Sequence, residues 1–501
     1  MFTAKAKIAY NACAFIQSGF PMQHPVIPQA YLDKVTPLLG DEATLRTFID
    51  YCQRPLRRSI RVNTLKITLP DFTERAQKQG WQLEAVPWCK EGFWLQRPAE
   101  QENLPLGNTA EFLAGMFYIQ EASSMLPPVA LLAGESGTTD ISRVLDMAAA
   151  PGSKTTQLSA SMNNQGLLVA NELSSSRLKV LNASLQRMGA MNVAMSHFEG
   201  QVFGQWLPEG FDAVLLDAPC GGEGTVRKDP LALQNWSEAA LHKLAAVQKE
   251  LMDSAFHALR PGGVLVYSTC TLSVEENQQV VNALLNRYPQ ALVVESLAGL
   301  FDGADKAVTP EGYLHVWPQL FDSEGFFVAR LRKTQSRLRP ERQKRTGKFP
   351  YVPAARQQTD EICHYLQRTF GLVLPEQHRL FKRDNDFWLF PSPLLEWMGQ
   401  FRFDRMGIKL VTAHRQGFRL THEAAIALGK QAVTGRYELS PEQLESYYQG
   451  KDLFVEVPPP QGELLLMFAG CAVGLGKGLN NRIKNSLPRD LVRDGRLVGW
   501  V

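Results

Sequence analysis

Between residues 142 and 330 the chain alternates short apolar runs, rich in β-branched residues, with longer segments in which apolar residues recur every three or four positions. Short continuous apolar runs predict buried strands, whereas the three-to-four spacing predicts helices that cover them. Strands that alternate with helices in this way are typical of a parallel sheet with crossover helices. The pattern therefore predicts a doubly wound, Rossmann-like α/β domain.

The predicted strands and helices of this domain are short and evenly spaced. Five strands are expected at 143–146, 166–171, 192–196, 213–217 and 263–270, with later strands near 313–317 and 325–331 completing the sheet. Helices are expected at 175–188 and 238–259. An Arg-Pro-Gly-Gly sequence at 260–263 predicts a turn between the second helix and its strand.

The 501 residues have room for about three domains. Residues 22–110 carry their own turn signals and are expected to form an N-terminal unit ahead of a core at 111–331. Residues 332–348 contain eight Lys and Arg against one acid, which predicts an exposed basic linker that we extend to residue 349. Residues 350–501, rich in short strands and turns, are expected to be a separate piece.

The amino-acid composition is that of an ordinary globular protein and excludes several other classes. The content of 45% hydrophobic and 21% charged residues excludes global disorder, a collagen repeat and a coiled coil. Seven cysteines without any C-x-x-C spacing argue against a disulfide framework or a cysteine-rich zinc site and suit a reducing compartment. The longest uncharged apolar stretch, 464–476, is too short to span a membrane. We expect a soluble cytoplasmic protein without a metal.

The first predicted strand ends in a turn of small residues, Asp146-Met-Ala-Ala-Ala-Pro-Gly-Ser-Lys154, which leads into a helix. Such a turn brings backbone N–H groups close to a nucleotide-like ligand. The loop matches neither a P-loop nor a dinucleotide loop, so its ligand lacks a pyrophosphate. Glu172 closes the second strand at the spacing of a ribose contact, which indicates S-adenosylmethionine. Small residues alone would equally suit close packing of helix and strand; the set with Lys154 and Glu172 favours a cofactor site.

Two cysteines follow neighbouring predicted strands, in Asp217-Ala-Pro-Cys220 and in Tyr267-Ser-Thr-Cys270. The carboxyl ends of neighbouring parallel strands open onto the same crevice, so both thiols should face one cleft. A single buried cysteine is more often an inert small apolar residue. Two thiols beside a carboxylate and facing a methyl donor favour chemistry instead.

Methylation of carbon 5 of a pyrimidine requires a thiolate that first adds to carbon 6, and cysteine is a strong nucleophile. Asp217, if protonated, could donate to ring N3, and the other thiol could help to release the methylated base. Methylation of an exocyclic amine is the competing reaction, but it usually needs an aromatic residue where Cys220 stands. These residues alone do not decide which thiol is the nucleophile.

At these motifs the sequence resembles the NOL1/NOP2/Sun family of RNA cytosine-5 methyltransferases. The resemblance begins near Met22, a candidate initiator after an extension at 1–21, and includes 54–66 and 117–124. It implies a Rossmann-like methyltransferase core with an N-terminal RNA-binding subdomain and a C-terminal PUA-like domain. It also implies methylation of 16S ribosomal RNA in the small subunit, at cytosine 1407 of the decoding region. We expect the enzyme to be monomeric.

The resemblance also assigns the site residues. Cys270 would be the nucleophile, Cys220 would assist release, and Asp217 would serve catalysis and cofactor binding. The implied contacts of S-adenosylmethionine are Ala148, Ala149, Ala150, Pro151, Gly152, Ser153, Lys154, Glu172, Glu199 and Asp217. The chain departs from the usual family residues at three positions. The family often has Cys where Ala148 stands, usually has Asp where Glu199 stands, and often has Ser where Gly221 stands.

RNA contacts are expected from two regions. Five cations without an acid lie in the segment 54–66 and suit phosphate contacts, although a solvated basic face would look the same: Arg54, Arg57, Arg58, Arg61 and Lys66. The segment 476–489 resembles the PUA-like RNA-binding domain of the family. The alternatives are a transfer RNA cytosine-5 methyltransferase and an RNA-binding assembly factor, and the intact Cys220, Cys270, Asp217 and Lys154 argue against the second.

Overall fold

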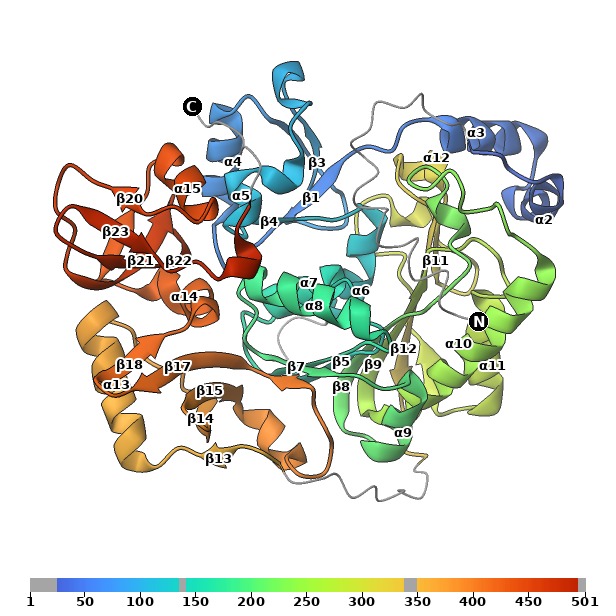
Figure 1. Cartoon of the computed structure of the whole chain (residues 1–501). Helices are drawn as coiled ribbons and strands as arrows, with labels where there is room; N and C mark the ends of the chain where they lie inside the picture. The colour runs from blue at the N-terminus through green and yellow to red at the C-terminus, as the bar shows by residue number, and fades with distance from the viewer. Residues whose placement is uncertain (1–24, 135–140, 338–348, 494–501) are drawn as a thin grey trace.

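The computed structural model describes residues 25–134, 141–337 and 349–493, and a nine-stranded sheet forms its centre (Figure 1). The five strands β9, β8, β5, β6 and β7 run parallel in that order, and antiparallel strands flank them on both sides. Across the sheet the strands are β10 (Leu292–Val294), β12 (Phe326–Lys333), β9 (Leu259–Thr269), β8 (Phe211–Asp217), β5 (Arg143–Asp146), β6 (Leu167–Asn171), β7 (Val193–Ser196) and β16 (Arg405–Met406), with β11 (Leu314–Val316) beside β12. The prediction of a Rossmann-like core is confirmed.

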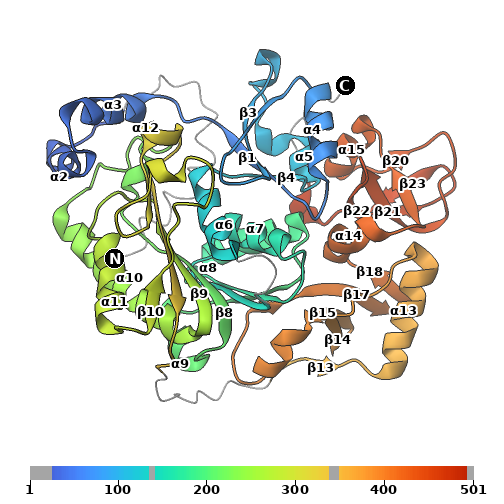
Figure 2. The same cartoon turned by 180° about the vertical axis from the view of Figure 1, so that it is seen from behind.

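Helices cover both faces of this sheet because alternate strand residues point to opposite sides. On β5, Val144 belongs to one apolar core and Leu145 to the other. One face carries α6 (Leu126–Leu132), α7 (Ser153–Ser161) and α8 (Ser175–Met188), and the other carries α9 (Phe203–Trp206), α10 (Glu238–Ala258) and α11 (Gln278–Arg287) (Figures 1 and 2). Ser174 and Ser237 cap α8 and α10 by accepting backbone N–H groups, so these helices begin where their sequences predict.

Residues 260–263, where a turn is predicted, belong to strand β9 but form an irregularity in it. Phe211 pairs with Leu259 and Ala213 with Val264, so the four residues between them lie opposite Asp212 alone. Gly262 takes the positive φ of +82° that the local bend requires. The Pro and Gly residues therefore bend the chain locally without ending the strand.

The N-terminal part forms a small antiparallel sheet above the core. Its strands are β2 (Gln82–Ala85), β3 (Gly92–Gln96), β1 (Ser59–Val62) and β4 (Phe117–Ile119), with helices α4 (Leu69–Lys78) and α5 (Ala110–Leu113) beside them. The preceding helices α2 (Gln29–Leu39) and α3 (Glu42–Gln53) pack instead against the core, next to Leu272 and Trp317 (Figure 1). Strand β4 pairs with β1 although it lies beyond residue 110. The small sheet thus extends past the predicted boundary at residue 110, because β4, which lies later in the chain, pairs with β1.

The C-terminal part contains two five-stranded sheets. The first comprises β13 (Val352–Pro353), β14 (His378–Arg383), β15 (Asp386–Pro391), β17 (Ile408–His414) and β18 (Gly417–Leu420), with helices α13 (Arg356–Phe370) and α14 (His422–Leu428). The second comprises β19 (Arg436–Glu438), β21 (Gly462–Phe468), β22 (Cys471–Gly478), β23 (Arg482–Asn485) and β20 (Leu453–Phe454), with helix α15 (Pro441–Tyr448).

The C-terminal part has two sheets of its own and also packs against the rest of the chain. Strand β16 extends the central sheet by pairing with β7, and the Tyr448 hydroxyl donates to the carbonyl of Leu113 in the N-terminal part at 3.1 Å. Apolar side chains of the N-terminal and second C-terminal sheets also share one core. Such long-range contacts leave no local signal in the sequence.

The predicted basic linker begins too early. Arg332 and Lys333 end strand β12, and the buried Lys333 ammonium donates to the carbonyls of Phe256 and Leu259 at 3.1 and 2.7 Å. The rest of that segment from 338 to 348, and the extension at 1–21, lie outside the described residues. Within the described ranges, no helix is both long and apolar enough to cross a membrane.

Candidate active site

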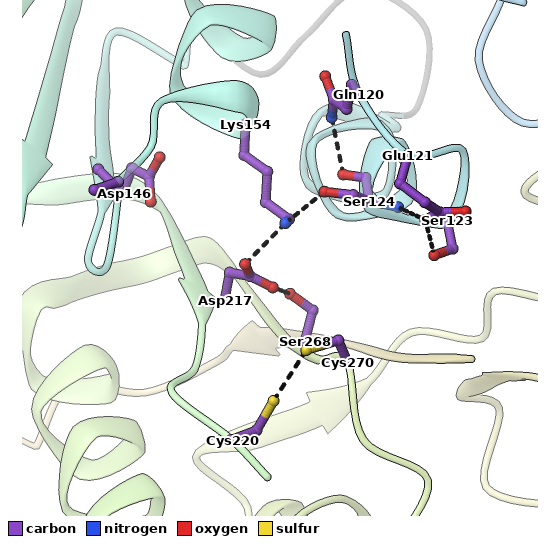
Figure 3. A network of polar contacts seen from close by, with 12 residues as sticks. Gln120, Glu121, Ser123, Ser124, Asp146, Lys154, Asp217, Cys220, Ser268 and Cys270 are labelled. Carbon is purple, nitrogen blue, oxygen red and sulfur yellow. Dashed lines mark hydrogen bonds and ion pairs between the residues drawn. The ribbon is translucent and has the colours of Figure 1, made fainter. Parts of the chain in front are cut away.

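Asp217 is the centre of a polar network at the carboxyl ends of the parallel strands (Figure 3). It ends β8 and lies in register with Ser268 on β9, whose hydroxyl donates to Asp217 Oδ1 at 2.8 Å. The Lys154 ammonium, from the first turn of α7, lies 2.8 Å from Asp217 Oδ2 and also donates to Ser124 Oγ at 2.8 Å. Both carboxylate oxygens of Asp217 therefore accept from fixed donors.

The two thiols lie next to this network, on the loops that follow β8 and β9. The sulfur atoms of Cys220 and Cys270 are 3.3 Å apart, and both cysteines are free and half-buried. The hydrogen bond to Cys270, together with burial, raises the pKa of the Cys220 thiol. Cys220 therefore keeps its proton at neutral pH and can donate it toward the sulfur of Cys270.

Two buried carboxylates that the sequence analysis missed hold the thiol loops together. Glu276 accepts from the Gly221 amide at 3.0 Å and from Gln248 Nε2 at 2.7 Å, while Glu223 accepts from the hydroxyls of Thr271 and Ser273, each at 2.7 Å. The sequence does offer a signal for both carboxylates, since each follows a thiol closely: Glu223 comes three residues after Cys220, and Glu276 comes six residues after Cys270. A Cβ at Gly221 would lie only 2.8 Å from Glu276 Oε1, so a larger residue here would require the Glu276 side chain to shift.

Replacing Glu276 with glutamine is expected to remove a pH-dependent loss of stability. Burial raises the pKa of Glu276 from 4.5 to about 7, so the folded protein keeps this proton over a range in which the unfolded chain releases it. The free energy of unfolding of the unaltered protein should fall by about 2 to 3 kcal/mol between pH 4.5 and 7 relative to the Glu276→Gln variant. Urea unfolding of both proteins across this range measures the difference, and parallel curves would refute the expectation.

The loop between β5 and α7 makes a tight turn against helix α8. Gly152 has a φ of +104°, which favours glycine, and a Cβ there would lie 3.0 Å from Leu181 Cδ1. Asp146, which the sequence analysis did not select, accepts from Thr155 Oγ1 at 2.7 Å through Oδ2, and burial raises its pKa to about 7. Its other oxygen is buried and has no partner among the described residues. A polar ligand donor would satisfy this oxygen, so the loop fits a bound cofactor.

The two acidic residues predicted to contact the cofactor, Glu172 and Glu199, differ in their burial. Glu172 follows β6, is buried, accepts from the Ser174 amide at 2.8 Å and lies 3.5 Å from Arg177 Nη1. Arg177 also donates to the carbonyl of Ala150, which ties Glu172 to the cofactor loop. Glu199 lies beyond β7 and is exposed.

Two of the five cations predicted to contact phosphate are buried, so that prediction is wrong for Arg61 and Lys66. Arg61 is 2% exposed and donates to the Ser153 carbonyl at 2.8 Å and to Thr156 Oγ1 at 2.9 Å, and Lys66 donates to the carbonyl of Ile426. Their side chains join β1 to the cofactor helix and to the C-terminal part. The other three cations reach the surface and form ion pairs there: Arg54 with Asp50, Arg57 with Glu84, and Arg58 with Glu102.

No group of three or more His, Cys, Asp or Glu side chains in the described parts of the chain is placed to hold a metal. The donor set at the site consists instead of thiols, one lysine and carboxylates. It suits covalent and proton-transfer chemistry on an organic substrate.

Family models match four consecutive parts of the chain. Residues 131–332 match 16S rRNA methyltransferase RsmB/F, and residues 27–122 match the N-terminal domain of 16S rRNA methyltransferase RsmF. Residues 351–428 match the pre-PUA domain of ribosomal RNA small subunit methyltransferase F, and residues 434–493 match the methyltransferase RsmF PUA domain.

Individual proteins agree with these models. The chain is 53% identical over 477 residues to "Ribosomal RNA small subunit methyltransferase F" of Aeromonas salmonicida, covering 94% of this chain and 98% of the relative. It is 51% identical to the Vibrio parahaemolyticus protein of the same name, covering 95% and 100%. A solved methyltransferase homologue from Pyrococcus horikoshii is 34% identical with a TM-score of 0.50, covering 61% of this chain and all of that one.

Proposed function

The chain belongs to the ribosomal RNA small subunit methyltransferase F family and is an S-adenosylmethionine-dependent ribosomal RNA methyltransferase, and from this premise we propose that it methylates carbon 5 of a cytosine in 16S ribosomal RNA. The observation that carries the proposal is the pair of thiols 3.3 Å apart beside the Asp217–Lys154 pair. By resemblance, the target is cytosine 1407 of the decoding region in the small subunit.

In the proposed reaction Cys270 is the nucleophile and Cys220 is the proton-bearing partner. The Cys270 thiolate adds to carbon 6 of the cytosine, which makes carbon 5 nucleophilic. S-adenosylmethionine supplies an electrophilic methyl group for carbon 5. For release, the Cys220 thiol gives its proton to the departing Cys270 sulfur and the resulting Cys220 sulfur accepts the carbon 5 proton. The electron pair of that carbon–hydrogen bond restores the double bond between carbons 5 and 6 as the bond between sulfur and carbon 6 breaks. Asp217, held by Lys154 and Ser268, faces the reacting base and orients it.

We assign the cofactor to the loop at 148–154 and its neighbours. Backbone N–H groups of this loop and the unpaired Asp146 oxygen would hold the polar parts of the ligand, and Glu172 would accept from its ribose hydroxyls. Asp217 would contact it near the reacting centre, and Glu199 would contact its adenine side. Cys220 stands where amine-methylating enzymes usually carry an aromatic residue, which favours carbon over nitrogen as the acceptor.

The experiment that tests the function is nucleoside analysis after incubation with methyl-labelled S-adenosylmethionine. Unmodified small subunits, naked 16S RNA and transfer RNA are compared in parallel. Label in 5-methylcytidine from the subunits or 16S RNA supports the proposal. Label only in transfer RNA would instead indicate a transfer RNA methyltransferase, and no label with retained cofactor binding would indicate an assembly factor.

An exposed face of the last sheet is the proposed RNA contact of the C-terminal part. Phe454 is paired with Arg482, and Lys477 with Lys484, so these four side chains share one side of the strands β20, β23 and β22. All four are exposed, Phe454 to 74%, whereas the intervening Leu453 and Ile483 are buried. An aromatic ring among cations suits a stacked base and its phosphates.

Replacing Phe454 with alanine is expected to weaken RNA binding roughly tenfold, because a stacked base is lost. Replacing Lys477 and Lys484 with glutamine should weaken binding and flatten its dependence on salt concentration. Filter binding at several salt concentrations measures both, with Val373→Ala, an exposed apolar residue (72%) in the first C-terminal sheet region, as control. S-adenosylmethionine affinity should not change, and unchanged RNA affinity in all variants would remove this face from the proposed interface.

A further inference from the structure

The active-site cleft has a second wall that the proposed mechanism does not use. The wall begins at Ser124, whose hydroxyl accepts a hydrogen bond from Lys154. The backbone amide of Ser124 donates to Glu121 Oε2 at 3.1 Å. The other oxygen of Glu121 accepts from the amide of Glu324 at 3.1 Å. Glu121 and Ser124 both lie near Lys154 in the site view (Figure 3). The contacts thus lead from the Lys154 side of the cleft to Glu324.

From Glu324 the wall returns to the nucleophile. The Gly325 amide donates to the carbonyl of Gly224 at 2.9 Å, and the Gly224 amide donates to the carbonyl of Cys270 at 2.9 Å. The two glycines touch so closely that a Cβ on Gly224 would lie 2.2 Å from the Gly325 oxygen. The next residue, Phe326, places its ring 5.4 Å from the Lys154 ammonium. The segment 324–326 therefore borders the cleft between Cys270 and Lys154.

One oxygen of the Glu324 carboxyl group has no hydrogen-bond partner among the described residues. The residue is 5% exposed, and its Oε1 is buried with no hydrogen-bond partner within the described ranges. Burial, then the nearby carboxylate of Glu121 and the thiol of Cys270, raise the pKa of Glu324 well above its usual range, although the cations Lys228 and Arg227 oppose this rise. The amide that holds Glu121 would be supplied by any residue here except proline. An unpartnered buried carboxyl lowers stability, so its presence beside a nucleophile indicates a partner that arrives with the substrate.

We propose that the carboxyl group of Glu324 donates a hydrogen bond to the N3–O2 edge of the target cytosine, which makes Glu324 a further catalytic residue. The assignment rests on the proposed function. Both oxygens of Asp217 already accept from Lys154 and Ser268, so Glu324 supplies the donor that the acceptor edge of the base needs.

The hydrogen bond acts on charge that appears only during the reaction. When the Cys270 thiolate forms the bond to carbon 6, the π electron pair of the double bond between carbons 5 and 6 shifts onto carbon 5. Conjugation then spreads the negative charge over N3 and O2. Carbon 5 then takes the methyl group, and the bond pair of the former sulfur–methyl bond stays on the sulfonium sulfur, which becomes neutral. Glu324 keeps its proton throughout. A donor aimed at developing charge accelerates the step by stabilising its transition state.

The test uses the full-length protein and 16S RNA in which 5-fluorocytidine replaces cytidine, presented as small subunits or as naked RNA. Fluorine on carbon 5 cannot leave as a proton does, so the methylated base stays bonded to the enzyme and is seen as a slow band on a denaturing gel. Its rate of formation reports attack and methyl transfer but not release. Glu324→Leu removes the donor, whereas Glu324→Gln keeps a neutral donor of nearly the same shape and serves as the matched control.

We expect Glu324→Leu to slow adduct formation about 100-fold and Glu324→Gln to slow it less than about tenfold. Glu324→Gln should also abolish the fall in rate at high pH that ionisation of Glu324 causes in the unaltered enzyme. Affinity for S-adenosylmethionine, measured by equilibrium dialysis, should match the unaltered enzyme in both variants.

Adduct formation by Glu324→Leu at the unaltered rate would overturn the assignment. Equal losses in both variants with weakened cofactor binding would also overturn it, since they would show a structural role. Absence of any adduct with the unaltered enzyme would overturn the proposed function itself, and the Glu324 assignment with it.

Discussion

Alanine in place of Cys270 is expected to abolish methyl transfer to RNA, with a loss of about 10⁴-fold or more. Without a thiolate at this position carbon 6 receives no nucleophile, and carbon 5 remains too weakly nucleophilic to attack the methyl group. The loss should fall on turnover alone, because Cys270 is not among the proposed cofactor contacts. Single-turnover transfer of labelled methyl groups to small subunits measures the effect, and equilibrium dialysis measures cofactor affinity.

Cys363→Ala is the matched control for this variant. Cys363 is also a free, half-buried cysteine, but it lies on α13 in the C-terminal part. It should retain full activity. If Cys270→Ala kept measurable turnover while Cys220→Ala lost all adduct formation, the roles of the two thiols would be exchanged.

Alanine in place of Cys220 is expected to trap the enzyme on its RNA. The Cys270 sulfur can still add to carbon 6 and the methyl group can still transfer, but release loses the thiol that lies 3.3 Å from the bonded sulfur. Turnover should fall by about 10² to 10³-fold, the range typical of a lost acid–base group. Denaturing electrophoresis with labelled RNA should show a slow protein–RNA band that the unaltered enzyme does not accumulate.

The double variant Cys220→Ala/Cys270→Ala checks the identity of the bonded sulfur. It should give no slow band, because the nucleophile is missing. A band that persists in the double variant would assign the bond to another group, and a Cys220→Ala protein that turns over normally would remove Cys220 from the release step.

Features that depend on a few neighbouring residues could be predicted from the sequence. The bounds of β5 and α8, the parallel core and the positions of Lys154, Asp217, Cys220 and Cys270 at strand ends all follow from short motifs and local periodicity. In a doubly wound sheet the carboxyl ends of the strands converge on one crevice, so placing a motif at a strand end also places it near the others. The catalytic roles of these residues remain predictions.

Other features depend on which distant segments meet, and the tertiary structure alone decided them. Arg61 and Lys66 are cations of the kind that bind phosphate, and their sequence segment looks like a phosphate-binding cluster. They are nevertheless buried against Ser153 and Ile426, so they have no access to RNA. Glu324 lies 54 residues beyond Cys270 and carries no motif; the antiparallel pairing of β12 with β9 and the backbone contacts through Gly224 bring it to the thiol. The chain determines local geometry and chemical type by itself, but burial and long-range pairing set the partners and charge state of each group.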